Sequence, residues 1–145
     1  MSRSVIFEIP GFVSVIEEPA LKAVRIRYDR LFDEAGRNIP AAVRAAAAFA
    51  SENSIPNWIA DTSIVRDELS ERDAAWVRTQ EFRGILLQSP VKTFVLIPAP
   101  EDADGIDNGW IPKWRDETEA GFEGQIAVHV LNEKAMRELL GASLA

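Results

Sequence analysis

"NWIADTSIVRDELSERDAAWV", residues 57–77, contains the pattern that decides the fold. Its first residues form an apolar run that ends at Asp61, and a run this short and this apolar indicates a buried strand rather than a surface helix. After a charged connector, Ser70 and Asp73 have the spacing of an acidic capping box, which predicts the start of a helix. A buried strand followed by a helix is the repeating unit of an α/β protein.

Downstream of this stretch the alternation of helix and strand continues. The pattern predicts a single helix over 70–88, a strand over 91–99, a short helix from Gly109, a strand over 124–131 and a helix over 131–141. The strand over 91–99 is almost uniformly apolar, which is typical of a central parallel strand. In the last helix, Asn132 is predicted to be the N-cap and Gly141 the C-terminal stop.

Upstream, apolar and polar residues alternate with the period of two that indicates strands. Residues 4–9 and 12–18 flank a Pro-Gly dipeptide that suits a tight turn, and a third strand follows over 21–30, with Arg25 and Arg27 on its solvent-facing side. An alanine-rich helix over 39–54 connects this region to the first stretch. The sequence therefore predicts one α/β domain over 1–145, with N-terminal antiparallel strands followed by parallel βα units in a mixed sheet.

The composition excludes several kinds of chemistry. The chain has 145 residues, of which 47% are apolar, so it is large enough for a core of its own. It has no cysteine and one histidine, His129, which leaves little for a metal site or a Ser-His-Asp triad, and we expect neither a metal nor a cofactor. We find neither a signal-peptide pattern nor a run of about 20 apolar residues, and we expect a cytoplasmic protein without a membrane span.

The net charge is −7, and most of it lies in the last third of the chain. Residues 99–145 contain four basic and ten acidic side chains. Without a basic patch, nucleic acid and anionic membranes are not expected partners, whereas a basic protein remains open. Solvated surface is the favoured interpretation of the acidic segment.

The order of motifs resembles the SpoIIAA-like, STAS/SEC14-type family of small bacterial proteins. The resemblance rests on "IPNWIADTSIVRDELSERDAAWVRTQEF" (55–82), on "VKTFVLIPA" (91–99) and on "VHVLNEKAMRELLG" (128–141), and it covers about residues 40–141. It implies a fold shared with anti-sigma-factor antagonists and related to lipid-carrying SEC14 domains, in proteins mostly without an assigned activity. Fold alone does not imply function.

One departure from the family concerns phosphorylation. The antagonists of this family have a phosphorylatable serine in an Asp-Ser-Ser-Gly-like turn that opens a helix, whereas this chain has Asp61, Thr62, Ser63 and Ile64, with the helix cap further on at Ser70. The departure argues against a phosphoswitch. Thr62 and Ser63 are still the phosphorylation candidates, although ordinary turn hydroxyls are the favoured interpretation.

Asp61 ends a predicted parallel strand, and open α/β sheets bind ligands at the carboxyl ends of such strands. Its carboxylate can instead accept loop amides and fix the turn, which we favour, just as we favour a capping role for Asp73. No nucleophile elbow surrounds Ser63, and His129 lies in a predicted strand. Asp61 and Asp73 have the residue types of a glycosidase pair, but no pattern indicates a sugar cleft. We therefore expect no enzymatic activity.

Four tryptophans complete the set of candidate residues. Trp58 and Trp76 are expected to be core or near-core anchors, with Trp76 also an interface or pocket candidate. Trp110 and Trp114 lie in the acidic segment, where they mark either an interface, the lip of an apolar pocket or ordinary core. The leading hypothesis is a non-enzymatic protein-interaction or regulatory module that binds a partner protein or its own copy as a homodimer, through the helix opening at Ser70 and the segment of Trp110 and Trp114. The alternative is a carrier of a small apolar or lipid-like ligand in a pocket between sheet and helices.

Overall fold

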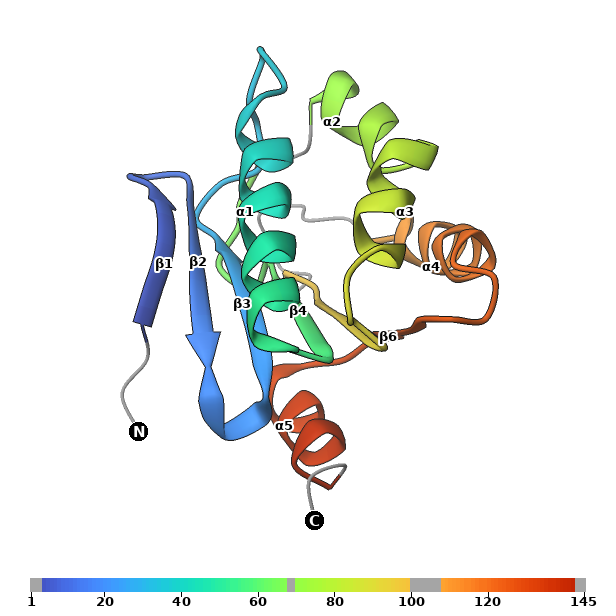
Figure 1. Cartoon of the computed structure of the whole chain (residues 1–145). Helices are drawn as coiled ribbons and strands as arrows, with labels where there is room; N and C mark the ends of the chain where they lie inside the picture. Colours follow the sequence, from blue (N-terminus) through green and yellow to red (C-terminus); the bar gives the residue numbers. More distant parts are fainter. Residues whose placement is uncertain (1–3, 68–69, 100–107, 143–145) are drawn as a thin grey trace.

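The computed structural model describes residues 4–67, 70–99 and 108–142. Within these residues, six strands form one sheet (Figure 1). The strands lie in the sheet in their chain order: β1 (Ser4–Ile9), β2 (Val13–Glu18), β3 (Ala23–Tyr28), β4 (Asn57–Asp61), β5 (Thr93–Ile97) and β6 (Ala127–Val130). The pairs β1–β2 and β2–β3 are antiparallel, and all later pairs are parallel. The predicted fold class, a mixed α/β sheet with antiparallel strands first, is confirmed.

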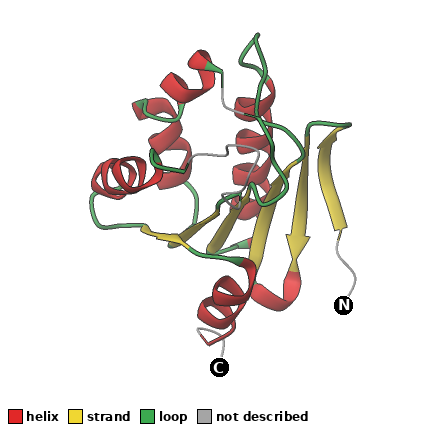
Figure 2. Cartoon of the chain, turned by 180° about the vertical axis from the view of Figure 1, so that it is seen from behind, coloured by secondary structure: helices red, strands yellow, loops and turns green. Residues whose placement is uncertain are grey.

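Helices cover both faces of the sheet unequally (Figures 1 and 2). The helices are α1 (Asn38–Asn53), α2 (Glu71–Trp76), α3 (Gln80–Leu87), α4 (Ile111–Gly121) and α5 (Glu133–Ala142), with a 3-10 turn η1 (Pro19–Leu21). Each parallel connection leads to the neighbouring strand in the same direction along the sheet. Because such crossovers are right-handed, α1, α3 and α4 lie on the same face. Among the described α-helices, α5 is the one on the opposite face, where Met136 and Leu140 share a buried cluster with Leu21 of η1, Ile59 and Val95. None of the described helices is both long and apolar enough to cross a bilayer.

The main core lies between the sheet and α1, α3 and α4. The alanines of α1 that face the sheet are fully buried, because small side chains let a helix approach the strands closely. Aromatic rings fill the space under α3 and α4: Phe94 lies 6.2 Å from Trp58, 5.9 Å from Trp114 and 6.4 Å from Phe122, measured between ring centroids. The sheet is thus held on this side by a dense apolar layer.

The helix predicted over 70–88 is wrong in one respect, because the chain forms two helices there, α2 and α3. The break is at Thr79, whose hydroxyl donates to the carbonyl of Trp76 (2.6 Å) and accepts from the amide of Phe82 (3.3 Å). A threonine hydroxyl that bonds to the nearby backbone competes with helix continuation and makes a good N-cap. Thr79 therefore ends the first helical segment and caps a second helix, α3.

Two predictions about helix ends have different outcomes. The helix predicted from Gly109 is α4, which begins at Ile111, and the part of the acidic segment over 100–107 lies outside the described residues. Asn132 accepts the amide of Ala135 (2.8 Å) at the start of α5. The predicted stop at Gly141 is wrong, because α5 continues through Gly141 to Ala142 and this glycine does not have the positive φ of a C-terminal cap.

Candidate functional site

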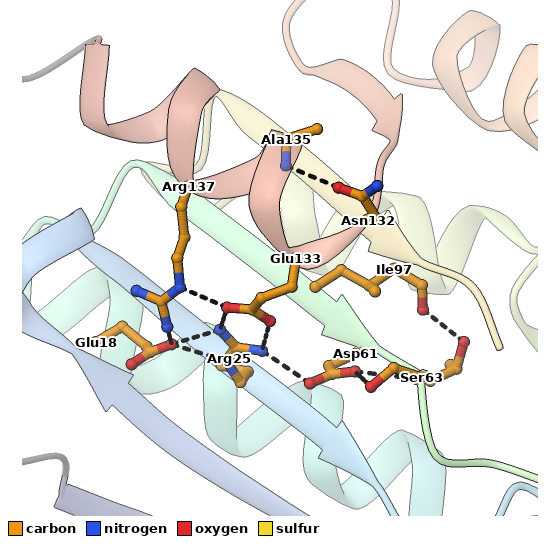
Figure 3. A network of polar contacts seen from close by, with 10 residues as sticks. Glu18, Arg25, Asp61, Ser63, Ile97, Asn132, Glu133, Ala135 and Arg137 are labelled. Carbon is orange, nitrogen blue, oxygen red and sulfur yellow. Dashed lines mark hydrogen bonds and ion pairs between the residues drawn. The ribbon is translucent and has the colours of Figure 1, made fainter. Parts of the chain in front are cut away.

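A buried arginine connects the sheet to α5 (Figure 3). The side chain of Arg25 on β3 is only 4% exposed. Its Nε donates to Glu18 on β2 (2.8 Å), its Nη1 donates to Asp61 on β4 (2.7 Å), and Nη1 and Nη2 bind both oxygens of Glu133 on α5 (2.9 Å each). We call these four residues the Arg25 cluster.

The register of the sheet brings the Arg25 cluster together. Arg25 is paired with Ile16 on β2 and with Ile59 on β4. Glu18 and Asp61 each follow those partners by two residues, and residues two apart on a strand point to the same face. The face is the one that α5 covers, so Glu133 in the first turn of α5 reaches the same guanidinium.

Charge pairing in the Arg25 cluster changes the pKa of Arg25 and of Glu133. Burial acts to lower the pKa of the Arg25 guanidinium, but hydrogen bonds to Glu133 and Glu18 outweigh it and raise that pKa above its ordinary value. The hydrogen bond from Arg25 lowers the pKa of the Glu133 carboxyl against the opposing effect of burial, and the charges of Arg25 and Arg137 add to it. Arg137 also binds Glu133 directly, with Nε 2.7 Å from Oε2.

The Arg25 cluster was not predicted, and the expectation that Arg25 faces solvent is wrong. Arg27, two residues further along the same face, is exposed as expected. Arg25 is buried because α5, which lies far along the chain, covers the part of this face that holds Arg25. The part that holds Arg27 is not covered in this way. The sequence signal for the cluster is Glu133, a carboxylate in the first turn of α5. Its partner cannot be inferred until the topology of the sheet is known.

Asp61 is the residue that links the Arg25 cluster to the loop after β4. Its Oδ2 accepts from Arg25, and its Oδ1 accepts from both the amide (3.0 Å) and the hydroxyl (2.6 Å) of Ser63. Thr62 bonds through its amide (2.9 Å) and its hydroxyl (2.7 Å) to the carbonyl of Ile97 at the end of β5. Both oxygens of Asp61 are thus engaged in holding the loop to the sheet.

Ser70 and Asp73 lie together at the start of α2. The Ser70 hydroxyl accepts a hydrogen bond from the amide of Asp73 (3.2 Å) and donates one to its Oδ2 (3.1 Å). Asp73 is fully buried, and its Oδ1 has no hydrogen-bond partner among the residues that the structure describes. Burial raises the pKa of the Asp73 carboxyl, opposed by the Ser70 hydrogen bond and supported by the charge of Asp33. Burial also raises the pKa of Tyr28, and the charge of Asp73 adds to this effect.

We expect Asp73→Asn to change how stability depends on pH. A carboxyl whose pKa is raised by folding contributes most below its ordinary pKa of about 4, and this contribution is lost as the pH rises through the folded-state value. The stability of the natural chain should therefore fall relative to Asp73→Asn as the pH increases above about 4. Urea unfolding of both proteins between pH 4 and pH 7 measures this, and two parallel pH profiles would contradict it.

The tryptophans occupy different environments. Trp58 is fully buried, and Trp76 is half-buried with its Nε1 bound to Glu81 (2.6 Å) and the guanidinium of Arg44 over its ring (5.8 Å). Trp114 is 7% exposed whereas Trp110 is 44% exposed, and their rings pack edge to face at 6.0 Å. Trp114 is thus a core residue, whereas Trp110 lies at the surface.

The predicted site residues do not converge on one centre. Asp61, Thr62 and Ser63 share one loop, and Ser70 and Asp73 share one cap, but no hydrogen bond within the described residues joins Asp61 to Asp73. His129 is half-buried on β6. In the described ranges, no group of three His, Cys, Asp or Glu side chains could hold a metal ion.

Two exposed apolar side chains that the sequence pattern does not indicate lie in the loop of Asp61 and in the loop bound to it. Phe32 follows β3 and Ile64 follows β4, and each exposes 53% of its surface. Asp67 joins the two loops by accepting the amides of Leu31 (2.7 Å) and Phe32 (3.0 Å). Trp110 precedes α4 in the connection after β5. We call Phe32, Ile64 and Trp110 the carboxyl-edge apolar residues, since each belongs to the connection that leaves the carboxyl end of a parallel strand.

Comparisons of this chain with protein-family models, with curated proteins and with solved structures found no match. The fold and the geometry of these residues are therefore the basis for a functional proposal.

Proposed function

We propose that this chain is a non-enzymatic protein-interaction or regulatory module, which binds a partner protein or a second copy of itself. The observation that carries the proposal is the exposure of the carboxyl-edge apolar residues on three successive connections. Large apolar side chains that are exposed on connections leaving the same end of parallel strands favour an interface, because their burial against a partner removes apolar surface from water. Asp67 fixes two of the three loops relative to each other, so the surface is preorganised.

The polar residues at the same edge support a binding role over catalysis. The Ser63 hydroxyl donates to Asp61, and Asp61 is held by the buried guanidinium of Arg25. A nucleophilic serine needs a general base that is free to take its proton, and a carboxylate that is ion-paired with Arg25 is a poor base of this kind. These residues are better suited to shape a surface than to perform a reaction.

The resemblance to the SpoIIAA-like, STAS/SEC14-type family points in the same direction, and membership of that family is part of the proposal. Within that family, the antagonist proteins act by binding other proteins. The present chain lacks the glycine of their Asp-Ser-Ser-Gly-like turn, so the proposal does not include a phosphoswitch at Thr62 or Ser63.

The packing favours the interaction module over the carrier of an apolar ligand. Trp58, Phe94, Trp114 and Phe122 fill the space between the sheet and the helices where a lipid-like molecule would have to lie. A hollow of about 470 Å³ beside α4 and β6 is lined in part by Asp116 and Glu119, and carboxylates do not suit an apolar ligand.

We expect the double variant Phe32→Ser with Ile64→Ser to weaken association by about 100-fold or more, since each lost apolar contact contributes about 1.5–3 kcal/mol. The first measurement is native mass spectrometry of the natural chain over a concentration series, compared with its denatured spectrum. Val5→Ser is the matched control, because Val5 is 60% exposed on the distant strand β1. A dimer that dissociates in the double variant and persists in Val5→Ser supports self-association.

Partner capture completes the test if the chain is monomeric. Natural chain, double variant and Val5→Ser are compared as baits at equal concentration. A protein retained by the natural chain and by Val5→Ser, but lost by the double variant, supports the proposal. A monomer whose captured proteins do not differ between variants contradicts it, and an additional mass that is lost on denaturation would favour the carrier instead.

A further inference from the structure

The strand β6 forms one edge of the sheet, and its backbone groups alternate between β5 and the outside. The amide of Ala127 donates to the carbonyl of Lys92 (3.0 Å), and the amide of Leu131 donates to the carbonyl of Leu96 (3.0 Å). Since alternate residues of a strand point their amides in opposite directions, those of Val128 and Val130 point away from β5. This edge therefore presents donors that β5 cannot satisfy.

One of these outward donors is already bound by a side chain. The amide of Val128 donates to Oε2 of Glu119 on α4 (3.0 Å), so a carboxylate occupies the place where a neighbouring strand would put a carbonyl. The outward amide of Val130 receives no such acceptor from residues 4–67, 70–99 or 108–142. Within the described part of the chain, the outward amide of Val130 is therefore free to bind an acceptor, and Glu119 places negative charge beside Val128.

The surface beside this edge is hollow and acidic. The hollow of about 470 Å³ is lined by Asp116, Glu119, Ala120, Gly124, Ile126 and Ala127. Segment 111–130 has four carboxylates and two cationic side chains. Arg115 pairs with Asp116 (3.1 Å) and, at a longer distance, with Glu119 (3.8 Å), while Lys113 pairs with Glu117 (3.8 Å), so the segment keeps an excess of negative charge. A ligand that lies along β6 would place its side chains next to Asp116 and Glu119.

We propose that the β6 edge binds an extended, basic segment of a partner protein, which adds to the sheet as a further strand. Backbone hydrogen bonds to the outward groups of β6 would supply the affinity, and Lys or Arg side chains would pair with Asp116 and Glu119. The opposite edge is less suited to this role, because the pairing of β1 is irregular between Val5 and Phe7, and such bulges hinder further pairing. This binding surface shares no residue with the carboxyl-edge apolar residues.

The key variant is Val130→Pro. Proline removes the outward amide and places its ring at the edge, while the amides that face β5 remain, and edge strands tolerate proline at such positions. His129→Ala is the matched control, since it changes the neighbouring residue of β6 without changing the outward backbone groups. Circular dichroism and urea unfolding establish that each variant is folded.

The probe is a phage-displayed library of random twelve-residue peptides, selected on the natural chain. We expect the enriched peptides to carry excess Lys and Arg, to bind His129→Ala normally and to lose about 10-fold or more in affinity for Val130→Pro. Glu119→Lys should cause a similar loss by charge repulsion, and it keeps the test decisive if Val130→Pro does not fold. For a selected peptide, the amide NMR signals of Val128 and Val130 should shift.

Several results would overturn the inference: enriched peptides without basic excess, equal binding to Val130→Pro, or tighter binding of the basic peptides to Glu119→Lys, which would show that Glu119 guards the edge. The Phe32→Ser with Ile64→Ser variant should bind the peptides normally. This makes failure at the β6 edge distinguishable from failure of the interface formed by the carboxyl-edge apolar residues.

Discussion

Replacing Arg25 with alanine is expected to lower the free energy of unfolding by about 3–5 kcal/mol, which is the usual cost of removing one partner from a buried ion pair. The substitution removes the buried cation that pairs with Glu18 and Asp61, and it removes both hydrogen bonds between Arg25 and Glu133 of α5. Urea unfolding at pH 7 measures the loss.

Arg27→Ala is the matched control for this prediction. Arg27 lies on the same strand and the same face as Arg25, but it is exposed, so its removal should change stability by no more than about 0.5 kcal/mol. Arg25→Lys should fall between the two, because an ammonium group cannot bind both oxygens of Glu133 in parallel. Equal effects of Arg25→Ala and Arg27→Ala would contradict the role of the Arg25 cluster.

The cost of Arg25→Ala should also depend on pH. Folding lowers the pKa of the Glu133 carboxyl, so the stability that this group contributes is present above its ordinary pKa of about 4.3 and is lost as the pH falls through the folded-state value. The difference between natural chain and variant should therefore shrink in acid. A difference that is constant from pH 7 down to pH 3 would argue against ion pairing as its source.

Trp114→Ala is expected to cost about 3–5 kcal/mol, the range for removing a large aromatic side chain from a core. The ring of Trp114 is almost entirely buried, and it packs at 5.9 Å on Phe94, which is itself in contact with Trp58 and Phe122. The cavity left by the missing ring opens at the centre of this aromatic layer, where the sheet limits relaxation.

Trp110→Ala should cost less than about 1 kcal/mol, although Trp110 is four residues away and contacts Trp114. Thermal and urea unfolding of the two single variants test the contrast, and equal losses would contradict it. The contrast also determines which variant can probe the surface. Trp110→Ala removes an exposed side chain from a folded protein. A variant with both Trp110→Ala and Trp114→Ala would combine loss of binding with loss of stability.

The sequence predicted those parts of the fold that depend on local patterns. Alternation over 4–28 indicated the antiparallel strands, and the change to helix and strand alternation after residue 38 indicated the parallel units. The spacing of Ser70 and Asp73 is equally local, and the structure places the two side chains in contact. The helix break at Thr79 was missed because the apolar pattern continues across it, while a single hydroxyl decides where the backbone turns.

The Arg25 cluster could not be predicted in the same way. The three carboxylates that bind Arg25 are 7, 36 and 108 residues away in sequence, so their meeting depends on strand register and on the face that α5 covers. Local periodicity places Arg25 on the side opposite the main core, but it does not reveal that a distant helix covers that side. Exposed apolar residues such as Phe32 and Ile64 were missed for a similar reason, since loop residues have no period from which burial can be inferred.

The sheet order has a consequence for how the chain assembles during synthesis. Because every strand pairs with the strand that precedes it, each new strand that leaves the ribosome finds its neighbour already made, and none has to be inserted between earlier ones. Loop closure therefore proceeds in short steps along the chain. The exception is α5, which must return to β3 to supply Glu133. A nascent chain that has formed β6 would thus have all six strands of the described sheet, but Arg25 would lack its ion pair with Glu133 until α5 folds.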